Sequence, residues 1–134
     1  MLWKRIFSKP VISKLPKALK MVLVVRADLR LSKGKTASQC AHAAVMCYEQ
    51  NHHHNRNDFL NAWKLLGQPK IVLRVDTGSE LEEIAREARN QGIVTALIRD
   101  AGRTEVSAGT ITVLGLGPDC QEKLNKITGK LKIL

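Results

Sequence analysis

The run Met21-Val22-Leu23-Val24-Val25-Arg26 constrains the fold of this chain more than any other part of its sequence. It is continuously apolar and rich in β-branched residues, which predicts a strand that is covered on both faces. Periodicity and turn residues predict further strands over residues 70–75, 93–99 and 110–114, and helices over residues 36–50, 58–66, 79–90 and 119–127. Strands that alternate with helices indicate an α/β protein with helices on both faces of its sheet.

A tight turn at Asp100-Ala101-Gly102-Arg103 connects the last two strands, so one strand must run antiparallel and the sheet must be mixed. Gly115, Gly117 and Pro118 are expected to end the fourth strand. The alternating tail, residues 130–134, is a candidate for a short edge strand. If the first and third strands are parallel, the loops that follow them open at the same edge of the sheet.

Two local patterns concern the helices. Ser79 and Glu82 predict a capping box at the start of the third helix. The histidines His52 to His54 fall in a polar segment, residues 51–57, that is expected to be a loop. They have no further ligand at helical or strand spacing, so we interpret them as solvated and predict no metal site.

The charge of the chain favours a polyanionic partner. Its 134 residues suit one domain, and they include 22 Lys and Arg against 12 Asp and Glu, for a net charge of +10. Such a balance indicates nucleic acid or an anionic membrane surface, without distinguishing the two. The longest apolar run near the N-terminus is far shorter than the ~20 residues that cross a bilayer, so no transmembrane segment is expected.

The N-terminal part is the most basic. The first 27 residues contain seven cations and no acid: Lys4, Arg5, Lys9, Lys14, Lys17, Lys20 and Arg26. Residues 1–19 are therefore interpreted as a basic extension, either a solvated tail or a targeting segment, ahead of a domain over residues 20–134. The three cysteines lack C-x-x-C spacing and favour a reducing compartment. We expect the cytoplasm, with the mitochondrion as second choice because the extension is basic and free of acids.

Gly34-Lys35-Thr36 has the last three letters of a phosphate-binding P-loop. A P-loop also needs a glycine five residues before Gly34, where this chain has Leu29. Gly115-x-Gly117 lacks the third glycine of a dinucleotide fingerprint. Nucleotide binding by either motif is therefore not predicted.

What remains is a set of polar residues at two positions in the predicted fold. Lys33 and Lys35 lie at a helix start, where free N–H groups favour an anion, and Gln39 and His42 follow on the face of Lys35. Asp100 follows the third strand, and Thr104 and Thr112 could add hydroxyl groups from the hairpin. A carboxylate, a lysine and hydroxyls without a nucleophilic Cys or Ser–His pair suggest hydrolysis by water. The residues alone leave open solvated roles for Lys35 and a packing role for His42.

Five stretches in order resemble the peptidyl-tRNA hydrolases of the archaeal and eukaryotic type. They are Lys20 to Arg26, Lys33-Gly34-Lys35 with Gln39 to Ala44, Gly67 to Lys70, Asp100 to Thr104, and Thr112 to Pro118. The similarity covers roughly residues 20–134. It implies a compact single domain of three α/β/α layers with a mixed four-stranded sheet, often a homodimer, that needs no metal or other cofactor.

The resemblance also implies a reaction and a set of site residues. Family members cleave the ester that joins a peptide to the 3′-terminal ribose of tRNA. By motif match, the catalytic positions are Lys35, Asp100, Thr104 and Thr112, and the substrate-binding positions are Lys33, Gln39, His42 and Arg103. The acceptor end of peptidyl-tRNA is the expected partner.

The alternative is a non-catalytic basic protein that binds tRNA, or acts as an adaptor, on the same fold. Such a protein would be expected to lose the set Lys35, Asp100 and Thr104, which this chain retains. One departure from the family pattern is Ala108, where members often have proline; it bears on the rigidity of the hairpin and not on its chemistry.

Overall fold

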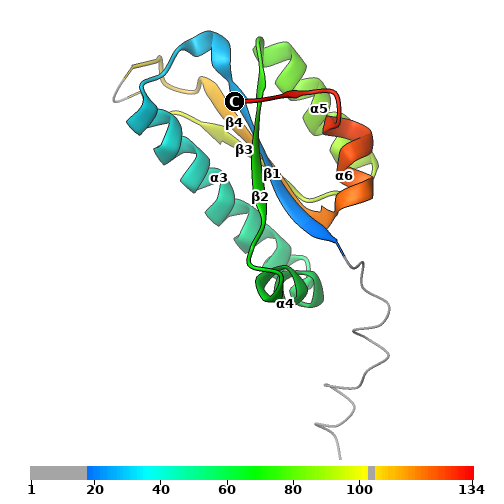
Figure 1. Ribbon diagram of the computed structural model, residues 1–134. Coiled ribbons are helices and arrows are strands. Elements are labelled where there is room, and N and C mark those ends of the chain that lie inside the picture. Colours follow the sequence, from blue (N-terminus) through cyan, green and yellow to red (C-terminus); the bar gives the residue numbers. More distant parts are fainter. Residues whose placement is uncertain (1–17, 103–104) are drawn as a thin grey trace, which may run out of the picture.

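The computed structural model describes residues 18–102 and 105–134 (Figure 1). One five-stranded sheet has the order β3-β4-β1-β2-β5. Its strands are β1 (Leu19–Arg26), β2 (Lys70–Val75), β3 (Thr95–Arg99), β4 (Ile111–Cys120) and β5 (Lys132–Ile133). β1 is parallel to β2, whereas β4 is antiparallel to both of its neighbours, β1 and β3, so the predicted mixed sheet is confirmed.

The expected count of four strands is wrong, because the C-terminal tail adds β5 to the free edge of β2. The added ladder pairs only Leu73 with Ile133 and Arg74 with Lys132. The short edge strand expected within residues 130–134 is therefore confirmed, although the count of four strands did not include it.

Helices cover both faces of the sheet (Figure 1). After the short 3₁₀ helix η1 (Ala27–Leu29), these are α3 (Lys33–His53), α4 (Asn57–Leu65), α5 (Gly78–Asn90) and α6 (Gln121–Thr128). Side chains of β1 alternate between two cores: Met21 and Leu23 lie in the core that includes Ala43 and Cys47 of α3, and Val22 and Val24 in the core of α5 and α6. The two buried faces explain the continuous apolar run and confirm the three-layer arrangement.

α3 is longer than its apolar stripe predicts. It continues to His53 and α4 begins at Asn57, so the loop expected over residues 51–57 is wrong for its first three residues and for its last. Asn51 is fully buried, and its amide donates to the carbonyls of Cys47 (2.8 Å) and Gly117 (2.7 Å). The two acceptors of this amide are 4 and 66 residues away, and the distant one has no local sequence signal.

β4 likewise passes through the glycines that were expected to end it. A Cβ atom placed on Gly115 would lie 2.5 Å from Cys47 Sγ and 3.1 Å from the carbonyl oxygen of Ala43. Gly115 therefore allows α3 to approach β4 closely, and it continues the strand instead of ending it.

The predicted capping box at Ser79 and Glu82 is also wrong. α5 begins at Gly78, and Thr77 is its N-cap residue, with Oγ1 accepting a hydrogen bond from Glu80 N at 3.1 Å. The cap lies two residues earlier than the pattern suggested. Within residues 18–102 and 105–134, no helix has the length and apolarity required to cross a membrane. Most of the expected basic extension lies outside the described residues.

Candidate active site

Two chain segments meet at the carboxyl ends of β1 and β3. β4 is antiparallel to both strands, so β1 and β3 run in the same direction and end at the same edge. η1 and a left-handed residue, Arg30, lead from β1 into α3, and Asp100 directly follows β3. The two loops therefore open together, as the sequence predicts.

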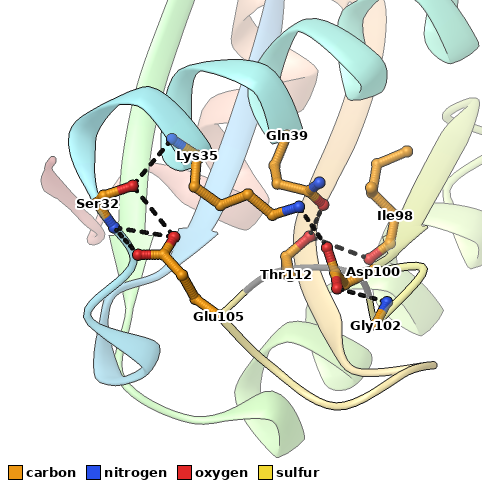
Figure 2. Close-up of polar contacts among 8 residues, drawn as sticks. All are labelled: Ser32, Lys35, Gln39, Ile98, Asp100, Gly102, Glu105 and Thr112. Carbon is orange, nitrogen blue, oxygen red and sulfur yellow. Dashed lines mark hydrogen bonds and ion pairs between the residues drawn. The ribbon is translucent and has the colours of Figure 1, made fainter.

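Lys35 and Asp100 form the centre of the site (Figure 2). Lys35 Nζ lies 2.5 Å from Asp100 Oδ1, and the two side chains are 16% and 1% exposed. Asp100 Oδ2 accepts a hydrogen bond from Gly102 N at 2.7 Å. The hydrogen bond from Lys35, followed by the one from Gly102 N–H, lowers the pKa of Asp100 below its ordinary value of 3.8, against the opposing effect of burial.

This pair has a clear chemical consequence. A carboxyl group with a lowered pKa is ionised at neutral pH and is a weak proton acceptor. It is better suited to hold a cation and to orient a polar group than to remove a proton from water. Lys35 belongs to the first turn of α3, where the helix dipole also favours negative charge.

A hydroxyl–amide pair lies beside the ion pair (Figure 2). Thr112 Oγ1 donates a hydrogen bond to Gln39 Oε1 at 2.5 Å, and both residues are buried. Gln39 is one helical turn beyond Lys35, so the same face of α3 carries both side chains towards β4. Thr112 thus fixes the amide of Gln39, and its hydroxyl is not exposed to solvent.

The other predicted site residues are not part of the cluster around Lys35 and Asp100. His42 is exposed and lines a surface depression with Met46, Ile98 and Arg99. Lys33 is exposed at the first position of α3 and lines a groove on the other side of the helix from Asp100. Arg103 and Thr104 lie outside the described residues, so their roles stay predictions.

Sequence reasoning missed two residues that connect the same segments. Glu105 accepts hydrogen bonds from Ser32 N and Ser32 Oγ, each at 3.1 Å (Figure 2). Ser32 is the N-cap residue of α3, and its Oγ accepts a hydrogen bond from Lys35 N at 3.2 Å. A serine three residues before Lys35 is a recognisable N-cap, whereas nothing in the sequence pairs it with a glutamate 73 residues later.

The start of α3 and the loop after β3 are therefore joined at two points, Lys35–Asp100 and Ser32–Glu105. The arrangement presents a fixed cation beside an ionised carboxylate and a buried amide. Such a site can stabilise an oxyanion and orient a water molecule. Among the described residues, no group of three or more His, Cys, Asp or Glu side chains is placed to hold a metal ion.

Comparisons with known proteins agree on one family. The family model described as peptidyl-tRNA hydrolase PTH2 matches residues 19–134. A peptidyl-tRNA hydrolase of Thermoplasma acidophilum is 52% identical over 115 residues, which cover 86% of this chain and 97% of the relative. One of Methanothermobacter thermautotrophicus is 44% identical over 116 residues, 87% and 100% of the two chains. The human protein named peptidyl-tRNA hydrolase 2, mitochondrial, is 44% identical over 114 residues, 85% of this chain and 63% of the relative.

Proposed function

We propose that this chain, which belongs to the PTH2 family of peptidyl-tRNA hydrolases, hydrolyses the ester between a peptide and the 3′-terminal ribose of tRNA and releases free tRNA and peptide. The family match confirms the resemblance inferred from the five sequence stretches. The observation that carries the proposal for this molecule is the Lys35–Asp100 pair at the start of α3, beside Gln39.

The roles that we propose follow from charge and burial. Water attacks the ester carbonyl carbon, and the ammonium of Lys35 stabilises the oxyanion that forms on the carbonyl oxygen. Asp100 stays ionised, holds Lys35 and orients the water through its remaining lone pairs. The bond from the carbonyl carbon to the ribose oxygen then breaks, and the proton lost by the water ends on that ribose oxygen.

Gln39 and Thr112 have distinct roles in this proposal. The amide of Gln39 contacts the substrate, and Thr112, whose hydroxyl donates a hydrogen bond to Gln39 Oε1, acts by positioning that amide. Thr104 stays a candidate for a direct contact on the strength of the sequence alone. Lys33, His42 and Arg103 are proposed to bind the tRNA, in keeping with the net charge of +10.

Catalysis without a metal is supported by a site in which both oxygens of Asp100 accept hydrogen bonds, one from Lys35 and one from Gly102. A homodimer is proposed from the family resemblance. The cytoplasm is the proposed compartment and the mitochondrion the second choice, because relatives named as mitochondrial exist and residues 1–19 are basic.

The deciding experiment measures release of free tRNA from N-acetyl-leucyl-tRNA, with and without EDTA. The unmodified chain should cleave the ester in both conditions. Asp100→Asn and Lys35→Ala should lower kcat/KM by at least about 100-fold, the scale of losing one oxyanion-stabilising group. Asp76→Asn is a matched control, because Asp76 also follows a parallel strand and pairs with an arginine, but its side chain is 70% exposed.

Three outcomes would contradict the proposal. Near-normal rates in Asp100→Asn and Lys35→Ala would contradict the assigned roles, and loss of activity in EDTA would contradict catalysis without a metal. Salt-sensitive binding of tRNA by the unmodified chain without any release would instead support the non-catalytic binding protein.

A further inference from the structure

A groove of about 660 Å³ lies on the side of α3 that faces away from Asp100. It is bounded by the first two turns of α3, the end of β1, the start of β2 and the C-terminal residues. α3 packs mainly on β4, β3 and β1, so β2 extends beyond it and forms the opposite wall. Most of the lining is aliphatic, and includes Val25, Ala37, Ile71, Val72 and Ile133.

The groove shares its helix with the candidate active site. Lys33 and Thr36 line the groove, whereas Lys35, between them, faces Asp100. An α-helix with its side chains is about 10 Å across. An extended peptide advances by about 3.3–3.6 Å per residue, so about three residues would pass from an ester at Lys35 around the start of α3 into the groove.

The cations that line the groove differ in their surroundings. Two cations, Arg30 and Lys33, are exposed at the end nearest the start of α3. The other two are engaged elsewhere: Arg26 pairs with Asp28 at 2.7 Å, and the ammonium of Lys70 lies 4.9 Å from the centroid of the Trp63 ring. None of the described residues that line the groove is acidic.

This pattern fits an apolar chain joined to a polyanion. RNA bases in single strands are held by stacking on aromatic side chains and by polar contacts to their edges. The described lining is mostly aliphatic and contains no aromatic residue, which fits apolar side chains of a peptide better than it fits bases. The two exposed cations lie where the phosphates of an attached RNA would pass.

We propose, on the basis of the proposed function, that this groove binds the peptide moiety of peptidyl-tRNA. It takes apolar side chains from about the third residue from the ester onward, while Arg30 and Lys33 face the phosphates of the acceptor end. The groove thereby favours substrates with longer apolar peptides over substrates with one residue or with acidic peptides.

The test compares KM for N-acetyl-leucyl-tRNA with KM for tRNA that carries an apolar peptide of four residues. Ala37→Glu places a charge in the groove and keeps a good helix former at an exposed position. It should raise KM for the four-residue substrate about tenfold, the loss expected for one buried aliphatic side chain, and leave N-acetyl-leucyl-tRNA unchanged. Ala41→Glu, the same change one turn later at an exposed position, should alter neither value.

A second variant, outside α3, controls for a folding defect in that helix. Ile133→Asp changes the opposite wall at a residue that is 70% exposed, and should reproduce the selective rise in KM. An equal rise for both substrates, no rise for either, or weaker binding of deacylated tRNA would overturn the proposal; the last would assign the groove to RNA. If the unmodified chain does not cleave N-acetyl-leucyl-tRNA, the proposed function fails and this inference fails with it. Activity on that substrate without peptide selectivity rejects the groove alone.

Discussion

Gly115→Ala should loosen the contact that sets the position of α3, and with it Lys35 and Gln39. The new Cβ atom would lie 2.5 Å from Cys47 Sγ and 3.1 Å from the backbone carbonyl oxygen of Ala43, so α3 and β4 must move apart. Burial raises the pKa of the Cys47 thiol to about 12, so this side chain is a neutral packing group whose displacement involves no change of charge. Overpacking of this kind costs about 1–3 kcal/mol.

The assay is urea and thermal unfolding followed by circular dichroism. At about 4 °C per kcal/mol for a domain of this size, Tm should fall by roughly 4–12 °C. Gly34→Ala is the control, because a Cβ atom there meets nothing within 4 Å and the residue lies in α3. It should raise stability by about 0.5–1 kcal/mol, since alanine favours a helix more than glycine does.

A double-mutant cycle isolates the contact. Cys47→Ala removes the sulfur that meets the new methyl group, so the double variant should be more stable than the two separate losses predict, by about 0.5–3 kcal/mol. Activity should follow the same order, because Lys35 and Gln39 move with α3. Unchanged stability of Gly115→Ala, or strictly additive losses in the cycle, would refute the assignment of Gly115 to close packing.

Two further predictions concern the charges of the site. The pKa of Asp100 is lower in the folded state than its ordinary value of 3.8, so the ionised side chain stabilises the fold at pH values above 3.8. That contribution to the free energy of unfolding is lost as the pH falls through the lower pKa of the folded state. Urea midpoints at pH 6, 4 and 3 should therefore fall more steeply in the unmodified chain than in Asp100→Asn, and parallel curves would count against the ion pair. Glu105→Ala removes the acceptor for Ser32 N–H and Oγ–H and should lower kcat/KM several-fold, with partial recovery in Glu105→Gln and no effect from Glu122→Ala at the start of α6. Equal values of kcat/KM in Glu105→Ala, Glu105→Gln and Glu122→Ala would mean that the contact between Glu105 and Ser32 does not position Lys35.

The parts of the fold that could be predicted depend on local patterns. The two buried faces of β1 produce an apolar run, and the parallel ends of β1 and β3 follow from the order of the elements, so the meeting of Lys35 with Asp100 was foreseeable. The parts that could not be predicted depend on distant contacts. Gly115 was expected to end a strand, because Cys47, the residue that it accommodates, lies on another element. Nothing in the sequence around Glu105 indicates its contact with Ser32.

Two polar contacts between α3 and β4 require the helix and the strand to match in length. Gln39 is held by Thr112, and Asn51 by the carbonyl of Gly117. Asn51 follows Gln39 by twelve positions, which span about 18 Å of helix, and Gly117 follows Thr112 by five positions, which span about 17 Å of strand. Removing one residue from the strand would shift an anchor by about 3.4 Å and reverse the face of every later side chain, and removing one from the helix would turn Lys35 by about 100° relative to Asn51. A chain that keeps both anchors must therefore keep both spacings, so insertions and deletions are confined to the connections outside these two stretches.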